Sequence, residues 1–518
     1  MTLPAPTSYA HRVRYLPLAL VLSYLTLTVL IFAFGPWQYP VADGVRLYGF
    51  LVLAHVALAV GYLTASRRAP LHVVTNDAVT RLVKVCLIVT LVLLVPTSLL
   101  NTGSVVPNML AGILDPGAAY ARSIELRSER PVLTLVAYVR ILVGPLLFLF
   151  FPLLVVYWSL LSARVRLSGS LALGFIVATY IAMGVNKGIA DLLGLFPALV
   201  LTAYFAGKLV VTQGQWARVA AGWLIAVLLF LWFFAGTQMT RAGSASQYGS
   251  LPAGVVKAST PIASPTATPV AVSPVAVSPS AAATPTQGGD ASSSPVAPLP
   301  TPVPTTTTPT FPGGQSRISV NYDNVLLRYL PSGPLRTGVV GLSSYVTQGY
   351  YALYLSLNKP FVPMFGVGHS LFLTQQAVRI TGNEQIGRLS YPKRIEEDGW
   401  DALGLWSSIY PWIASDVSFP GTIVVVFLIG RLFALAWFDA LAGRNPFAYG
   451  MLAQFAVMLL YFPANNQTSQ FGEGFTAFWS ILVAWLITRN RAWPVFSRRT
   501  AVQRGSPAPT AGVPSDSD

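Results

Sequence analysis

The chain has 518 residues, of which 53% are hydrophobic and only 10% are charged. A soluble domain usually carries about 25% charged residues, so this composition excludes an ordinary soluble protein and predicts an integral membrane protein. The net charge of +15 is also found in nucleic-acid-binding proteins. Many of the basic residues flank apolar runs, however, where membrane orientation explains them, so we expect no nucleic-acid partner.

Apolar runs of about the length of a membrane-spanning helix recur along the chain. They predict an all-α polytopic membrane protein of about ten helices, with runs at 16–34, 48–65, 83–100, 132–158, 170–185, 192–206, 219–234, 422–441, 447–462 and 475–487. The first run follows His11, Arg12 and Arg14, as in a signal peptide. Residues 33–40 offer no clear cleavage site, so we interpret this run as a retained helix.

Lysine and arginine mark the cytoplasmic side of a membrane protein. With ten helices, most basic clusters fall on one side and both termini lie in the cytoplasm, which predicts a multi-pass protein of the cytoplasmic membrane. The outward segment 101–131 is the exception, because it carries Arg122, Arg127 and Arg130. The spacing of charges in 120–131 predicts a short helix with internal ion pairs, or a solvated charged face. Outward arginines suit phosphate and diphosphate groups.

The composition divides the chain into five parts. Residues 1–241 hold the N-terminal membrane helices, and 242–316 form a Pro-, Ser-, Thr- and Ala-rich extracytoplasmic linker, expected to be disordered. Residues 317–420 form an extracytoplasmic module, 421–490 the C-terminal membrane helices and 491–518 a disordered cytoplasmic tail. A passive spacer and a glycosylated stalk both stay open for the linker.

The module 317–420 contains 7 of the 18 acidic residues, together with basic and aromatic residues. Its segment Val339–Leu357 is amphipathic. This segment either lies in the membrane interface or forms a re-entrant pair with Phe361–Leu373. If both segments cross the membrane, there are twelve helices and the termini stay on the same side.

Two short motifs bring polar groups to the outward side. Asn186, Lys187 and Asp191 stand between two apolar helices, where a cation can hold an anionic ligand. A lysine that snorkels from a helix end is the alternative. His369 is flanked by glycine, and an imidazole can act as a general base near neutral pH.

Residues 388–421 supply the remaining candidates. Arg388 and Arg394 are cations, and Asp401 and Asp416 are candidate catalytic carboxylates. Trp400, Trp406 and Tyr410 offer flat apolar faces of the kind that a sugar ring needs. An interfacial aromatic belt and a solvated charged loop are the alternatives. Asp416 also precedes the helix expected from Thr422 and would favour its N-terminus.

Metal chemistry is not expected. Cys86 is the single cysteine, which excludes an intramolecular disulfide and a multi-cysteine metal site. The four histidines are scattered, and nucleotide-binding and zinc-hydrolase motifs are missing from the sequence. We therefore expect no cofactor.

The stretch WSSIYPWIASDVSFPGTIVVVFLIG resembles one in bacterial oligosaccharide repeat-unit polymerases (Wzy-type, O-antigen polymerase-like). The matching positions are Trp406, Tyr410, Asp416, Gly421 and Gly430. The turn with Gly184 and Lys187, the arginines Arg122 and Arg127, and the spacing of Arg388 and Gly399 are also similar to the family.

The resemblance implies a glycosyltransferase that joins polyprenyl-diphosphate-linked oligosaccharides into a surface polysaccharide, at the outer face of the cytoplasmic membrane. Arg122, Arg127, Lys187, Arg388 and Arg394 are then expected to bind substrate, without a metal or a nucleotide sugar. His369, Asp416 or Asp401 would activate an acceptor hydroxyl. Membrane lipid is an expected partner, and chain-length regulator and flippase proteins are candidate partners. An O-antigen ligase-like transferase, a transporter or flippase of lipid-linked sugars, and an envelope scaffold are the alternatives.

Overall fold

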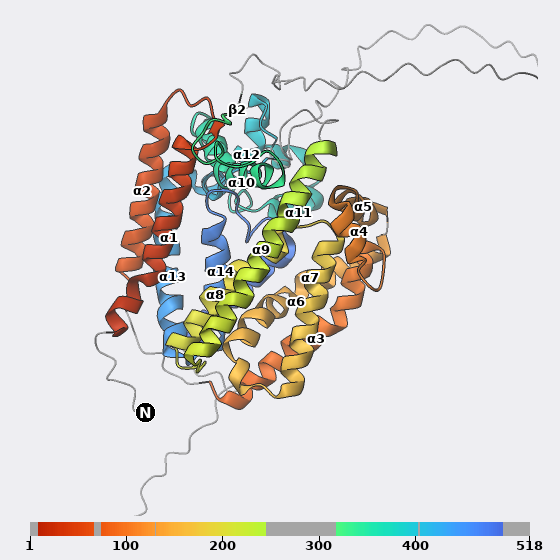
Figure 1. The fold of residues 1–518 in the computed structure, drawn as a ribbon. Helices are drawn as coiled ribbons and strands as arrows, with labels where there is room; N and C mark the ends of the chain where they lie inside the picture. The colour runs from red at the N-terminus through yellow and green to blue at the C-terminus, as the bar shows by residue number, and fades with distance from the viewer. Residues whose placement is uncertain (1–8, 67–73, 130, 245–317, 402–404, 491–518) are drawn as a thin grey trace, which may run out of the picture.

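The protein is a bundle of long helices with a smaller group of helices packed across one end (Figure 1). The computed structural model describes residues 9–66, 74–129, 131–244, 318–401 and 405–490. The expected linker lies outside the described residues from 245 onward, and so does the expected tail. Helix α9 reaches Ser244, so the first three residues expected in the linker are helical.

Long helices make up the N-terminal part. They are α1 (Tyr9–Phe34), α2 (Gly44–Leu63), α3 (Asn76–Thr102), α6 (Pro131–Val156), α7 (Ala163–Ala182), α8 (Lys187–Phe205) and α9 (Gln213–Ser244). Two shorter helices, α4 (Met109–Leu114) and α5 (Pro116–Glu129), connect α3 to α6. Helix α5 confirms the short helix predicted in 120–131, although it begins earlier, at Pro116.

The C-terminal part adds α13 (Ile409–Ala442), α14 (Pro446–Leu460) and α15 (Gly472–Asn490). Among the described residues, eight helices are long and apolar enough to cross a membrane, namely α1, α2, α3, α6, α7, α8, α9 and α13. Helices α14 and α15 occupy the places of the ninth and tenth predicted helices and pack against each other and against α6. The predicted all-α polytopic membrane fold is therefore confirmed.

We call the helices between the linker and α13 the cap. They are α10 (Pro334–Leu357), α11 (Leu371–Thr381) and α12 (Tyr391–Arg394), with 3₁₀ turns at Glu384–Arg388 and Ile395–Asp398. Most of α10 is buried, and it packs on α9 and α1. The residues 361–370 form no helix, so α10 is followed by a loop and then by α11. A two-residue strand before the cap, β2 (Ser319–Val320), pairs antiparallel with β1 (Trp37–Gln38).

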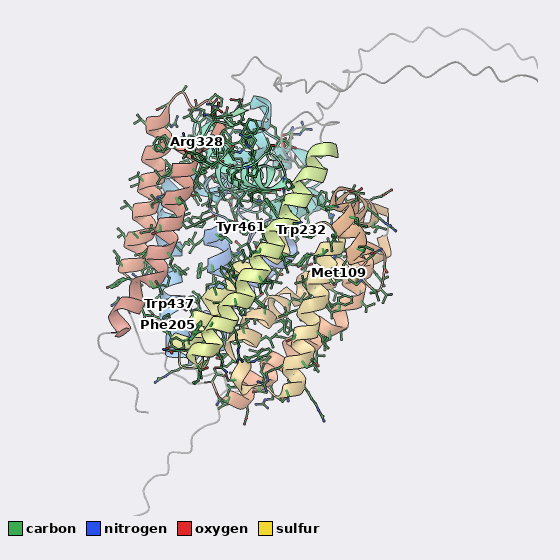
Figure 2. All side chains as sticks on the ribbon, in the orientation of Figure 1. Met109, Phe205, Trp232, Arg328, Trp437 and Tyr461 are labelled. Atoms are coloured by element: carbon green, nitrogen blue, oxygen red, sulfur yellow. The ribbon has the colours of Figure 1, made fainter. Side chains whose placement is uncertain are left out.

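The end of the bundle opposite the cap gathers basic residues. The indole of Trp437 donates to the Val13 carbonyl, 3.2 Å away, and Asn445 donates to Thr488 across 2.9 Å. The start of α1 and the end of α15 therefore lie together beside the end of α13. Trp437 and Phe205 lie near this end in Figure 2, and Arg328 lies at the cap. The basic residues at this end include Arg14, Lys208, Arg444 and Arg489. Their grouping agrees with the prediction that both termini share one side.

Helices α2 and α13 approach each other through paired glycines. A Cβ on Gly61 would lie 2.0 Å from the Phe427 carbonyl oxygen, and one on Gly430 would lie 2.2 Å from that of Leu58. Neither position has room for a methyl group. Small residues at a helix interface let backbones approach closely, which is how helices associate where lipid removes the hydrophobic driving force.

We predict that Gly61→Ala destabilises the fold by about 1–3 kcal/mol, because the added methyl group must push α13 away. The melting temperature in detergent can be followed with a thiol-reactive dye, since Cys86 is the single cysteine and is buried. Gly49→Ala in the same helix is the matched control, because a Cβ there meets nothing within 4 Å. Equal melting temperatures for the two variants would contradict this packing.

Candidate functional site

The loop that carries His369 is held by one carboxylate. Oδ1 of Asp416 accepts hydrogen bonds from the backbone N–H groups of Gly366 and Gly368, each at 2.8 Å. Oδ2 accepts from the backbone N–H of His369 and lies 2.8 Å from its Nδ1. We call this arrangement the Asp416 clasp. It brings together two of the three predicted catalytic residues, which lie 47 positions apart in the sequence.

The clasp fixes the tautomer of His369. An ionised carboxylate can only accept hydrogen bonds, so Nδ1 is the nitrogen that carries the proton. Nε2 of the neutral ring is then left with its lone pair. Nε2 is buried, and it has no hydrogen-bond partner among the described residues. A buried imidazole nitrogen that is oriented but unpartnered is suited to take a proton from a ligand.

A break in α13 aims Asp416 at the loop. Ser418 has φ 66° and ψ 171°, so the helix is interrupted two residues after the carboxylate. Before the carboxylate in the chain, the hydroxyl of Ser415 donates to the Pro411 carbonyl and accepts from the Tyr391 backbone N–H at 2.9 Å. Asp416 therefore does not cap a helix that begins near Thr422, as the sequence suggested, and holds the loop of His369 instead.

The polar segment 461–473 runs beneath the cap and touches the loop of His369. Asn466 donates from Nδ2 to the His369 carbonyl at 2.6 Å, and Ser370 donates to the Ser469 carbonyl at 2.6 Å. This segment contains five consecutive buried polar side chains, Asn466, Gln467, Thr468, Ser469 and Gln470. The start of α13 is fastened to the beginning of this segment, because the Ile409 N–H donates to the Phe462 carbonyl.

A cluster of four charges lies at the two ends of this segment. The guanidinium of Arg140 in α6 forms a two-point ion pair with Glu473, at 2.6 and 2.7 Å, and donates to Thr97. Lys187 pairs with Asp191 one turn later in α8, at 2.5 Å. The hydroxyl of Tyr180 lies within electrostatic range of all four charges. The cluster is therefore electrically balanced, which lowers the cost of placing charges close to the membrane.

Tyr461 links this cluster to the cap. Its hydroxyl donates to Asp191 at 2.9 Å, and its ring lies 5.9 Å from that of Trp406. Burial raises the pKa of Tyr461 well above its ordinary value, so the phenol stays protonated and remains a donor. Tyr461 lies below the cap in Figure 2.

The predicted cations have different surroundings. Arg122 on α5 and Arg388 are exposed, and the side chain of Lys187 is 36% exposed. Arg394 donates to the Pro360 carbonyl at 2.6 Å and lies over the ring of Tyr391, so it stabilises the cap. The side chain of Arg127 lies outside the described part of the chain.

The remaining predicted residues lie in the cap and at the start of α13. Tyr410 is 1% exposed and contacts the rings of Phe50 and Phe462, and Trp400 packs against Tyr351. Both rings belong to the hydrophobic core. Trp406 is half-buried between Tyr345 and Tyr461. Asp401 is also half-buried, and its carbonyl accepts from the Leu405 N–H at 2.8 Å.

The sequence prediction did not include Glu473, Tyr461 or the amide-rich segment between them. The signal was present, because PANNQTSQFGEG interrupts two apolar helices with amides and hydroxyls and only one charge. Neutral amides carry no charge pattern, so the prediction concentrated on arginine and aspartate.

Comparisons with protein-family models, curated proteins and solved structures give no match to this chain. The assignment of function therefore depends on the residues described above.

We predict that Glu473 and Arg140 are energetically coupled. Glu473→Gln leaves the guanidinium without its counter-charge, and Arg140→Gln leaves the carboxylate alone. The double variant removes both charges, so it should lose less stability than the sum of the single variants, by roughly 0.5–3 kcal/mol. Thermal unfolding of the four proteins in detergent measures this difference. Strictly additive losses would show that the ion pair does not stabilise the fold.

Proposed function

We propose that the chain polymerises polyprenyl-diphosphate-linked oligosaccharide repeat units into a surface polysaccharide, with His369 as the general base. The observation that carries this proposal is the Asp416 clasp, which leaves Nε2 of His369 buried, oriented and unpartnered among the described residues. A catalytic base held by a carboxylate is the arrangement by which many enzymes activate a hydroxyl group.

The location of the clasp supports the same proposal. The clasp lies at the cap end of the bundle, opposite the end where the basic residues gather. The end of a membrane protein that is rich in basic residues is usually cytoplasmic. A base at the opposite end would meet substrates that have already crossed the membrane. Oligosaccharides attached to a polyprenyl diphosphate meet that condition, because the lipid part can stay in the bilayer while the sugars reach the cap.

The reaction is a displacement at an anomeric carbon. The hydroxyl of the acceptor sugar loses its proton to Nε2 of His369, and its oxygen bonds to the anomeric carbon of the donor. The bond between that carbon and the diphosphate oxygen breaks, and polyprenyl diphosphate leaves with the bonding electrons. The carboxylate of Asp416 stabilises the imidazolium that forms.

The leaving diphosphate needs positive charge. Arg122, Arg388 and Lys187 are the predicted cations whose side chains are exposed or partly exposed. Guanidinium groups bind phosphate oxygens at two points, so they can stabilise the departing charge without a metal. Lys187 contributes less net charge than an isolated lysine, because Asp191 neutralises it.

The charged cluster around Tyr180 favours a second candidate function, a transporter of lipid-linked sugars. Ionisable residues near the membrane often mark a substrate or proton path. This alternative assigns no proton transfer to His369, so the two functions differ in what they require of Nε2.

We predict that His369→Ala and Asp416→Asn each lower the rate of polymerisation about 10²–10⁴-fold. His369→Ala removes the base. Asp416→Asn places an amide where the loop presents only donors, and the ring loses its fixed tautomer. The measurement is the length distribution of surface glycan in cells that carry each variant at normal protein level. Single repeat units should replace long chains.

Gln375→Ala is the control, because this side chain is exposed on α11, six positions from the histidine. Normal chain length in His369→Ala cells would refute the proposal. Lipid-linked units retained on the cytoplasmic face would favour the transporter. Long chains that stay on the lipid carrier would favour a ligase-like transferase.

A further inference from the structure

Phe365, four residues before His369, has an unusual combination of backbone and side chain. Its φ angle is +51°, in the left-handed region that side chains rarely adopt. The residue is 88% exposed. Among the described residues, only Phe365 and Ser418 combine a side chain with a positive φ, and the two flank the Asp416 clasp in the chain.

The clasp explains the positive φ angle of Phe365 but not the presence of an aromatic side chain there. The left-handed turn at Phe365 and Gly366 lets the N–H groups of Gly366, Gly368 and His369 reach the Asp416 carboxylate. Glycine at position 365 would adopt the same φ angle with less strain. The chain carries a large aromatic residue there, and the exposed ring gains almost nothing from packing within the protein. Strain of this kind in a loop with a catalytic group points to a role in recognition.

We propose that Phe365 stacks on a sugar ring of the oligosaccharide whose hydroxyl group loses its proton to His369; this inference rests on the proposed function. One face of a sugar ring carries C–H groups and matches the flat face of an aromatic ring, which binds both by contact area and by its π-electrons. The clasp holds Phe365 and His369 in one short loop, so it fixes the distance from the stacked sugar to Nε2. Trp400 and Tyr410, which the sequence offered for this role, have their rings in the core.

A cysteine-protection experiment tests the stacking without measuring catalysis. Cys86 is the single cysteine, so Cys86→Ala provides a background for Phe365→Cys in the full-length protein in lipid nanodiscs. The thiol is labelled with a membrane-impermeant maleimide. The probes are the lipid-linked oligosaccharides extracted from cells that lack the gene, and the oligosaccharides released from them by mild acid. Both probes should slow labelling several-fold. Phe361→Cys, at a position 42% exposed in the same segment, is the matched control and should not be protected.

Kinetics provides the second measurement. Phe365→Ala should raise KM for the acceptor about ten-fold, or about 1.4 kcal/mol, with kcat within two-fold of the parent. Phe365→Tyr and Phe365→Trp should restore KM. Unchanged KM in Phe365→Ala, or protection of the cysteine by sugar-free polyprenyl diphosphate alone, would overturn the inference. If His369→Ala is inactive while Phe365→Ala is normal, only the stacking fails. If His369→Ala is fully active, the proposed function fails.

Discussion

The arrangement of the candidate site depends on the carboxylate of Asp416. It accepts three backbone hydrogen bonds and one from an imidazole, all at 2.8 Å, while its side chain is only 9% exposed. Charge-assisted hydrogen bonds are roughly twice as strong as neutral ones, which offsets the cost of removing the carboxylate from water. The same four bonds determine the shape of the loop, the tautomer of His369 and the exposed position of Phe365. Structure and proposed chemistry are thus set by one side chain.

The second constraint is the cost of polar groups close to a membrane. The segment 461–473 is rich in amides and hydroxyls, and its contacts pair polar groups from several helices. Tyr461 binds Asp191, Asn466 and Ser469 bind the loop of His369, and Glu473 binds Arg140. Non-helical backbone close to the membrane is tolerated where other parts of the protein surround it. The segment therefore forms a polar floor beneath the cap, and charges that would be costly alone are paired there.

The sequence predicted much of the fold, because apolar runs of membrane length have few other uses. The run predicted at 16–34 ends at Phe34 as α1 does, and the run at 447–462 corresponds to α14, Pro446–Leu460. The site was predictable only in part. His369 and Asp416 could each be selected by residue type, but their contact depends on the interruption of α13 at Ser418, which leaves no periodic signal. Aromatic residues such as Trp400 and Tyr410 are found both in sugar-binding sites and in hydrophobic cores. Only the tertiary packing shows that these two belong to the core.

The most direct test of the clasp is ¹⁵N nuclear magnetic resonance of the full-length protein with labelled histidine, with His369→Ala used to assign the His369 signals. For the neutral ring, the structure predicts the proton on Nδ1, in a hydrogen bond to Asp416, and an unprotonated Nε2. The Asp416→Asn variant should lose that preference. A proton on Nε2 in the parent protein, or signals that do not respond to the substitution, would contradict the claim that Asp416 prepares His369 to act as a base.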